Sequence, residues 1–496
     1  MLGKKRSRIV RSIRILLAAL SYSFCVPAHL IAAPIQPGLL SYQLRYAGAG
    51  DSRVSLQITP ETPLASPVTL IIPRSYPGGY SFVRYDDFVE QVHAFSPDGK
   101  SLDCGKDPDG PRWAIGAKGQ NVARIEYRVD IKKMDDQIRD SVESSKLRDG
   151  YLMILGYSVF GYIDGLEKNP VALEAIGPRD WPVLSTLDPQ PGTQKESTKA
   201  KAANFDTLAD SQVAMGPSLQ FRRLAGKINL IVASYSEVEE DLDAESKMAR
   251  EALDRVQEYF GDIPFPTYTA LLEFLKPQEG HSYGFSQEHD SSGTFSLSVE
   301  SATNAQSSAN HRSSATFNYA HHMAHCWIPK RVWGADYRPY NWELTPIIET
   351  IWFNEGFGRY AAMQALVLGM TEQEGKALRE RSINRTRGVL DSAPDFIKRM
   401  PLPRLSQEAS FLYGDDFRMG MNIFSRGFLI AAEMDDRIQS QTGGQKSMRD
   451  AYRALLTWSA QNQRAFQVDE LTRIISESTG VNVEDIMARW MRPLSP

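Results

Sequence analysis

The period of the apolar residues changes once along this chain of 496 residues, near position 235, and that change limits the fold to two successive kinds of domain. Before it, short β-prone runs at 54–58, 68–72 and 125–131 alternate with turn clusters such as Pro77-Gly78-Gly79. Repeated strand–turn spacing predicts an antiparallel β-sandwich, and we expect a strand at 227–233 to close it.

After position 235 the period becomes helical. Met248 and Val256 lie on one face of a helix expected at 243–260, and Thr371 with Glu374 has the pattern of a capping box. Further helical patterns occur at 420–438, 447–458, 468–476 and 483–491. The second half of the chain is therefore expected to be mainly helical.

These patterns predict an α+β protein. We expect a β-rich domain at 34–235 and a mainly helical domain at 236–496. A Ser-rich polar stretch at 291–314 has no period, so we expect it to be a loop over one face of the helical domain.

The residues at 1–33 have the order of a secretory signal. Six Lys and Arg residues precede an apolar stretch at 15–26, and small residues follow at Ala28, Ala32 and Ala33. A basic, an apolar and a small-residue region in that order predict a signal peptide and a periplasmic or secreted protein. An uncleaved membrane anchor is the alternative.

Composition excludes some classes of partner. The chain is 42% hydrophobic and 23% charged, with a net charge of −4, which argues against nucleic acid as a partner. No apolar run of membrane-spanning length follows the N-terminal stretch. Cys104 and Cys326 would remain after cleavage, too far apart in sequence to suggest a disulfide. We expect Cys326 to be a buried structural cysteine, with metal ligation as the alternative.

Histidines are concentrated in one part of the chain. Six of the eight lie between positions 281 and 325. His321 and His325 are four residues apart, which on a helix is roughly 40° of rotation and about 6 Å of rise, so both rings face one point. Zinc accepts imidazole nitrogen, and its catalytic sites use three protein ligands. Such a pair is weak evidence by itself.

A carboxylate in an apolar segment strengthens the metal hypothesis. Glu355 lies within a helix expected at 344–368 and is flanked by Trp352, Phe353 and Phe357. Burying a carboxylate among aromatic rings is costly unless a cation receives it. From the spacing alone, a Glu355 side chain that faces solvent is as good an interpretation as one that binds a metal.

The segment from 321 to 360 resembles the glycyl-aminopeptidase-like family of zinc metallopeptidases, a branch of the gluzincins. That family has His-Glu-x-x-His, then Trp, Lys-Arg, Asp-Tyr and Leu-Trp-x-x-Glu-Gly. The corresponding residues here are His321-His322-Met323-Ala324-His325, Trp327, Lys330-Arg331, Asp336-Tyr337 and Ile351-Trp352-Phe353-Asn354-Glu355-Gly356. Further similarity occurs at 78–84, 97–100 and 210–216.

The resemblance implies zinc as the cofactor, His321, His325 and Glu355 as its ligands, and a thermolysin-like second domain. It also implies a role for Glu288 and His289 in binding substrate. The PDZ module common in the family is expected to be absent.

Three departures from the family put catalysis in doubt. His322 stands where the family has its general base, a group that contributes about 10²–10⁴-fold in rate. Phe424 matches the position of the tyrosine that donates to the oxyanion, with a misalignment in this less distinctive region as the alternative. Loss of such a donor costs about 10²–10³ in rate. Phe285 and Ser286 replace glycines beside the substrate, which is expected to narrow the cleft.

Two functions therefore compete. The chain is expected to be an exported zinc-binding protein with impaired catalysis that binds a peptide or protein ligand in the cleft. The alternative is an active zinc aminopeptidase in which His322 or another group serves as the base.

Overall fold

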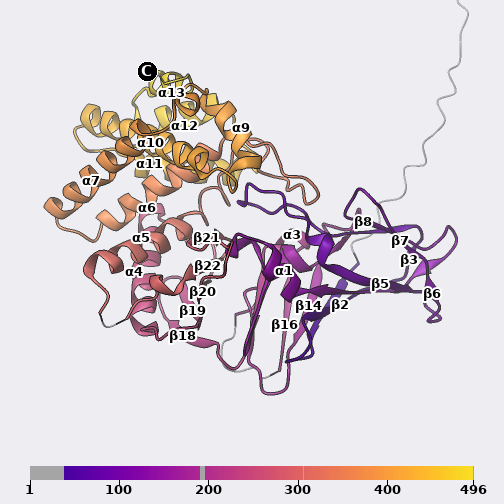
Figure 1. Ribbon diagram of the computed structural model, residues 1–496. Coiled ribbons are helices and arrows are strands. Elements are labelled where there is room, and N and C mark those ends of the chain that lie inside the picture. Colours follow the sequence, from indigo (N-terminus) through magenta and orange to yellow (C-terminus); the bar gives the residue numbers. More distant parts are fainter. Residues whose placement is uncertain (1–37, 190–195, 305, 495–496) are drawn as a thin grey trace, which may run out of the picture. The chain divides into compact units, whose positions relative to one another are not determined.

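The computed structural model describes residues 38–189, 196–304 and 306–494 (Figure 1). The signal segment expected at 1–33 lies outside these residues. Within them, no helix combines the length and the apolar character that a membrane crossing requires. Figure 1 shows strands through the first half of the chain, in indigo to magenta, and helices through the second, in orange and yellow. The expected α+β class is confirmed.

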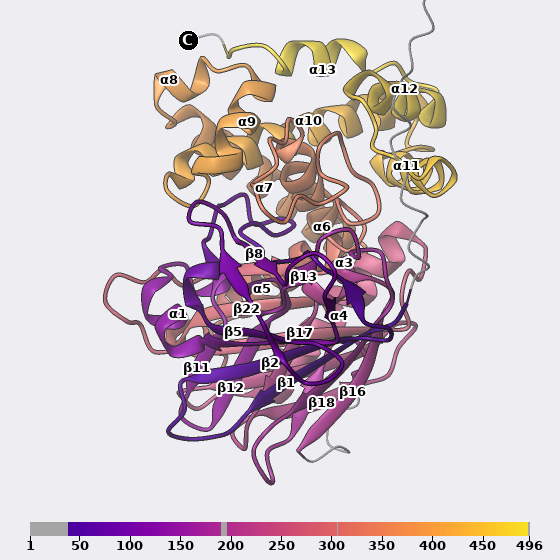
Figure 2. The ribbon, with the colours of Figure 1, turned by 90° about the vertical axis from the view of Figure 1, so that its right-hand side faces the viewer.

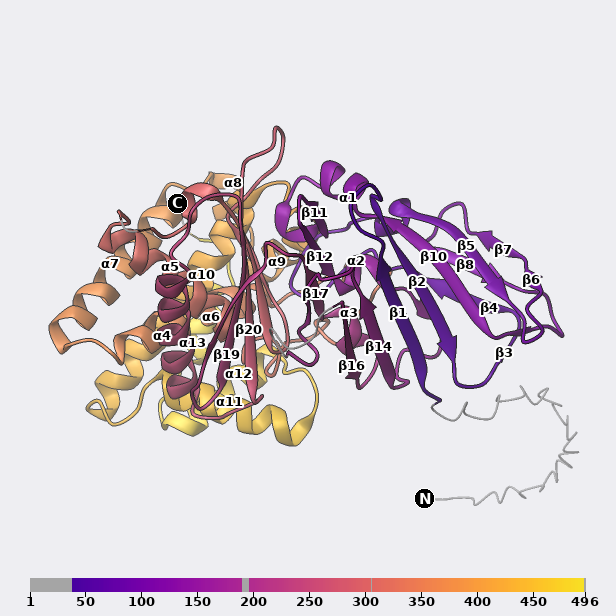
Figure 3. The same cartoon turned by 90° about the horizontal axis from the view of Figure 1, so that it is seen from below.

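A seven-stranded sheet forms much of the N-terminal part (Figure 3). Its order is β16 (Ser197–Ala202), β14 (Val171–Ile176), β1 (Leu40–Tyr46), β2 (Arg53–Pro60), β10 (Arg124–Asp130), β5 (Val89–Phe95) and β6 (Ser101–Leu102). Buried residues alternate along β2, as a strand with one face on the core requires. However, β1 pairs with β14 in parallel, so the expectation of a purely antiparallel sandwich is wrong for this pair. The long connection between them allows a parallel crossover.

Smaller sheets complete this part around a shared core. They are β11 (Lys146–Arg148), β12 (Tyr151–Leu155), β17 (Gln212–Met215) and β15 (Val183–Ser185); β13 (Tyr162–Ile163), β4 (Val68–Ile71), β8 (Arg112–Ile115) and β7 (Cys104–Lys106); and the pair β3 (Leu64–Ala65) and β9 (Asn121–Val122). Short helices connect the strands: η1 (Tyr85–Phe88), α1 (Ile131–Gln137), η2 (Ser141–Glu143), α2 (Gly156–Val159) and α3 (Phe205–Ala209).

A separate five-stranded mixed sheet begins the second part. Its order is β18 (Gln220–Leu224), β19 (Asn229–Ser236), β20 (Thr267–Leu275), β22 (Ser292–Ser298) and β21 (Phe285–Glu288). The strand expected at 227–233 is β19, and it pairs with β18 and β20 instead of closing the first part. The loop expected at 291–314 is also wrong, because it contains β22 and the start of α5. Thr294 to Leu297 are β-prone, and Ser296 Oγ donates to Glu273, so the serines of β22 are compatible with a buried strand.

Helices form the rest of this part. They are α4 (Leu242–Phe260), η3 (Val299–Ser301), α5 (Ala309–Ala324), η4 (Phe353–Phe357), α6 (Gly358–Val367), α7 (Glu372–Asp391), α8 (Asp395–Lys398), α9 (Leu402–Leu412), α10 (Phe417–Thr442), α11 (Met448–Asn462), α12 (Val468–Thr479) and α13 (Glu484–Trp490). Figure 2 shows α11 and α12 next to each other, with α13 running from their side toward the C-terminal end. The capping box at Thr371 and Glu374 is present and begins α7.

The helix expected at 344–368 begins later than predicted. Residues 344–350 are not helical, and Pro346 disfavours a helix through the residue before it. The helix starts at Ile351 and passes through one π-helical turn, η4, before continuing as α6. Such turns occur often at functional sites, and this one contains Glu355.

Two glycines let η4 and α10 approach closely. A Cβ on Gly427 would collide with the carbonyl oxygen of Trp352, and one on Gly356 would collide with the backbone of Gly427. Because Phe424 precedes Gly427 by one turn of α10, this approach holds Phe424 beside the helix that carries Glu355.

Candidate metal centre

The structure brings together the three residues expected to bind zinc. His321 and His325 lie at the C-terminal end of α5, and Glu355 lies in η4. The Nε2 atoms of the two histidines are 3.3 Å apart. Glu355 Oε2 lies 3.7 Å from His321 Nε2 and 3.5 Å from His325 Nε2. All three side chains are buried.

This triangle fits a zinc ion. Ligand atoms at 2.0–2.1 Å from a tetrahedral zinc lie about 3.3–3.4 Å from one another, close to the three distances observed. His325 Nδ1 is 2.8 Å from the carbonyl oxygen of Ile328, which it reaches as a donor in the neutral ring. The Nε2 lone pair of His325 is then free to bind a metal, and a second partner on the other nitrogen is typical of metal-binding histidines.

The charges of the site also match a cation. Burial lowers the pKa of His321 well below its ordinary value, and the neighbouring His325 and His322 lower it further, so the ring is neutral. Burial would also lower the pKa of His325, but the carboxylates of Glu288 and Glu355 raise it to about 9. Without a metal, His325 thus carries the positive charge that these two carboxylates attract.

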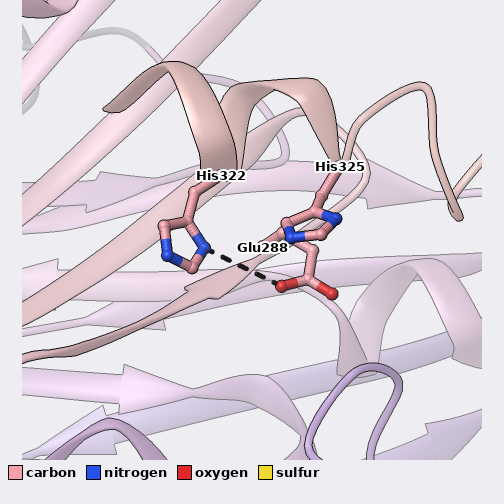
Figure 4. Close-up of side chains that lie close together, drawn as sticks. All are labelled: Glu288, His322 and His325. Atoms are coloured by element: carbon pink, nitrogen blue, oxygen red, sulfur yellow. Dashed lines mark ion pairs between the residues drawn. The ribbon is translucent and has the colours of Figure 1, made fainter. Parts of the chain in front are cut away.

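A second group lies next to the first. Glu288, His322 and His325 also place one ligand atom each within 4.8 Å of one another (Figure 4). Figure 4 shows His322 and His325 on the same helix, both facing Glu288 from β21. His322 Nδ1 is 4.0 Å from Glu288 Oε2, a wider spacing than in the first group. Because His325 Nδ1 is hydrogen-bonded to the carbonyl oxygen of Ile328, only its Nε2 is free to bind a metal. His325 can therefore be a ligand in only one of the two groups at a time.

A cavity of about 350 Å³ lies in front of these side chains. We call it the metal-site cavity, and its lining includes His321, His322, Glu355 and the residues of β21. Four of its lining residues are acidic: Asp140, Glu143, Glu288 and Glu355. Burial raises the pKa of Asp140 to about 6 and that of Glu143 to about 7, and it also raises the pKa of Glu288. A cationic group entering the cavity would meet several carboxylates.

The two residues expected to contact substrate have different surroundings. Glu288 lines the cavity, and its Oε1 has no hydrogen-bond partner within the described residues. His289 does not line it: its Nδ1 lies 3.1 Å from Asp210 Oδ1 and its Nε2 lies 3.3 Å from Thr294 Oγ1. Since neighbouring strand residues point to opposite faces, Glu288 faces the cavity and His289 faces the core.

Asp210 links two of the segments that resemble the family. Lys330 Nζ is 3.1 Å from Asp210 Oδ1, and both side chains are buried. Asp210 also accepts a hydrogen bond from the backbone of Asp290. Cys326 is a buried free thiol whose Sγ donates to the carbonyl of His289, in agreement with a structural role.

The remaining departures lie in the cavity wall. The Phe424 ring is centred 5.8 Å from the ring of His321, and no hydroxyl is present at this position. Phe285 lines the cavity and packs edge-on against Phe417, with centroids 5.3 Å apart. An aromatic side chain therefore occupies space that a glycine would leave open.

Several cavity residues were not identified from the sequence, among them Arg359 and Tyr413. Arg359 lies four residues after Glu355, a helical spacing that indicates the same face, so this signal was available. Tyr413 also lines the cavity, and burial together with the charges of Glu355 and Glu288 raises the pKa of its hydroxyl. No local pattern distinguishes Tyr413, because it follows α9 and reaches the site only through the fold.

Comparisons with known proteins agree with this architecture. The Peptidase M61 N-terminal domain matches residues 41–217. None of the curated proteins matches the chain significantly. An aminopeptidase N family protein from Idiomarina loihiensis has a similar structure, with a TM-score of 0.80 at 18% identity, covering 92% of this chain and 77% of that chain.

Two more solved structures share the fold at lower similarity. A variant of an M1 zinc metallopeptidase from Deinococcus radiodurans has a TM-score of 0.55 at 14% identity, covering 92% of this chain and 95% of that chain. Native LTA4 hydrolase from yeast also has a TM-score of 0.55 at 14% identity, covering 92% and 68% respectively. At these identities the likeness concerns the fold. Together with the domain matched at residues 41–217, this shared fold supports the resemblance to the gluzincin-like zinc metallopeptidases of the M61 family.

Proposed function

We propose that the protein is an exported zinc-binding member of this metallopeptidase group, with impaired catalysis, that binds a peptide or protein ligand in the metal-site cavity. The observation that carries the proposal is the triangle of His321, His325 and Glu355 with His322 beside it. The triangle supports zinc binding. The histidine at position 322 supports the loss of efficient hydrolysis.

When bound, zinc would supply Lewis-acid chemistry to a carbonyl group in the cavity. Around it, His321, His325 and Glu355 would hold the metal, and Glu288 would receive the amino group of a peptide. Phe285 and Phe417 would restrict the room beside that group.

His322 is poorly suited to act as a base here. Burial lowers its pKa well below the ordinary value, and the positive charges of His325 and Arg359 lower it further. A group with so low a pKa accepts a proton weakly near pH 7, where a general base works best if its pKa is close to the pH. A zinc ion nearby would disfavour the charged ring further.

The alternative is an active aminopeptidase in which His322 or another group is the base. Glu288 Oε2, at 4.0 Å from His322 Nδ1, supports this alternative because a carboxylate can orient an imidazole. Tyr413 also lines the cavity, and its hydroxyl would compensate for Phe424.

Metal analysis of purified wild-type protein and of His325→Ala tests the proposal. We expect about one zinc per wild-type chain and a loss of most of it in His325→Ala, because three ligands become two. His93→Ala, which changes an exposed histidine on β5, serves as the control and should retain zinc. Equal zinc content in folded His325→Ala would reject the site.

Activity on glycyl- and alanyl-amide substrates separates the two functions. The proposed function predicts little or no turnover by the zinc-loaded wild type. Strong turnover that a chelator removes and that His322→Ala abolishes would establish the alternative.

A further inference from the structure

Two arginines beside the metal-site cavity form no ion pair with a carboxylate among the described residues. The Arg359 guanidinium lies over the rings of Phe317 and Phe424, at 5.4 Å and 5.7 Å from their centroids. Neither Arg359 nor Arg385 of α7 forms an ion pair or a hydrogen bond with another described residue. Arg359 is half-buried, so its charge is costly unless an anion joins it.

The two charges are also close to each other. Burial lowers the pKa of Arg359, and the charge of Arg385 lowers it further, which the smaller opposing effects of Tyr413 and Glu355 do not offset. Guanidinium groups stay protonated at physiological pH in spite of such shifts, so the repulsion persists. The rings of Phe317 and Phe424 contact the guanidinium of Arg359 but carry no negative charge to compensate it.

Both arginines line a second cavity, of about 410 Å³, that adjoins the first. We call it the arginine pocket. It shares His321 and Arg359 with the metal-site cavity, and none of its described lining residues is Asp or Glu. Its polar lining consists of Ser313, Ser314, Asn318, Ser382, Thr386 and the residues just named.

The two cavities thus differ in charge. Four carboxylates and the shared Arg359 line the metal-site cavity, whereas two guanidinium groups and no carboxylate line the arginine pocket. A ligand with an amino group at one end and a carboxylate at the other would match both. Guanidinium groups bind carboxylates through paired, charge-assisted hydrogen bonds, and the hydroxyl and amide groups of the pocket can add further donors.

We propose that the arginine pocket binds the C-terminal carboxylate of a short peptide whose amino group lies in the metal-site cavity. This inference rests on the proposed function and adds a ligand class: free peptides of a few residues, as opposed to the N-terminal segments of long chains. Arg359 and Arg385 are then the residues that determine specificity for the carboxylate.

Calorimetric binding of trialanine and of trialanine amide to the zinc-loaded protein tests this inference. The two ligands differ only in the terminal charge. We expect trialanine to bind at least about tenfold more tightly than its amide, as a charged hydrogen-bonded pair provides. In Arg385→Gln the two should bind within about threefold of each other. Arg387→Gln, on the same exposed helix but outside the pocket, should keep the wild-type preference.

Equal affinity of the wild type for trialanine and its amide would overturn the inference. A preference for trialanine that survives in Arg385→Gln would also overturn it. Either result would leave the proposed peptide binding intact. Absence of binding by both ligands would instead count against the proposed function. In that case N-acetylalanine, which has a carboxylate and no amino group, is titrated into the metal-free protein. Binding that Arg385→Gln weakens at least fivefold would support the arginine pocket alone, and no binding would overturn it.

Discussion

His322 and Phe424 lie beside the three candidate ligands, at positions where the resemblance implies catalytic residues. The distinctive motif around His321 pointed to position 322, whereas Phe424 was matched through a separate and less distinctive segment. The sequence did not indicate that Glu288 would lie 4.0 Å from His322, since β21 and α5 meet only in the folded chain. The resemblance also implied that both Glu288 and His289 contact substrate. Side chains alternate between the two faces of a strand, however, so these neighbours point in opposite directions.

We expect His322→Glu to increase aminopeptidase turnover and the double variant His322→Glu, Phe424→Tyr to exceed it by about 10²-fold. A general base and an oxyanion donor act on the same transition state, so restoring one leaves the other missing. Turnover of an alanyl-amide substrate at equal zinc content is the measurement. If single and double variants had the same turnover, the hydroxyl would come from elsewhere, and Tyr413 lines the cavity.

Glu143 provides a pH-dependent contribution to stability. Burial raises its pKa from 4.5 to about 7, although Ser81 and Tyr76 donate hydrogen bonds to it. A carboxyl group with a raised pKa binds more protons in the folded state, so the wild type loses stability as the pH rises from about 4.5 to about 7. Glu143→Gln keeps an oxygen that accepts both hydrogen bonds and removes this loss.

Urea unfolding at pH 5 and pH 8 tests this prediction. We expect Glu143→Gln to be more stable than the wild type at pH 8 by about 1–2 kcal/mol, and the difference to shrink markedly at pH 5. The full shift would give more, but Glu143 is partly exposed at the cavity wall. A difference that is independent of pH would contradict the assignment.

At the scale of elements, the contact between η4 and α10 places Phe424 at the site. The sequence predicted both helices but not their contact, because Gly356 and Gly427 carry no local signal of close approach. The π-helical turn at Glu355 was also missed, since apolar periodicity does not distinguish one wide turn from an ordinary helix. The strand β22 was not predicted because serine is common in loops. The hydrogen bond from Ser296 to Glu273, which makes a serine compatible with a buried strand, forms only on folding.

Gly427→Ala is expected to lower the free energy of unfolding by about 1–3 kcal/mol, because its Cβ would meet the Trp352 carbonyl and the two helices would have to separate. Urea unfolding monitored by circular dichroism measures the change. Gly388→Ala is the matched control, since nothing lies within 4 Å of its Cβ on α7. That variant should gain about 0.5–1 kcal/mol from helix propensity. Unchanged stability of Gly427→Ala would show that the contact is not tight.

At the scale of the whole molecule, the metal-site cavity draws its lining from residues far apart in the sequence, including Gly78 and Glu143 as well as Phe424. The change of apolar period predicted two kinds of architecture correctly. It placed β19 with the wrong sheet because a strand's own sequence does not specify its partner. The domain boundary at 235/236 stays a prediction, while the change of sheet occurs before β18.

The signal hypothesis concerns the whole molecule as well. We expect expression in a bacterial host to give an exported protein whose first residue lies between about 29 and 34, as the small-residue region predicts. Mass spectrometry of the intact protein identifies that residue. Leu16→Arg with Leu17→Arg breaks the apolar stretch and should prevent export. An intact Met1 on the wild-type cytoplasmic protein would refute the signal hypothesis.

The position of β21 has one more consequence. It is an edge strand, bonded on one side to β22, and the consecutive residues from Tyr283 to Glu288 line the metal-site cavity. An extended ligand that paired with such an edge would be recognised through its own amide groups, with little regard to its side chains. Replacing amide hydrogens of the ligand by methyl groups would then weaken binding more than exchanging one side chain for another of similar size.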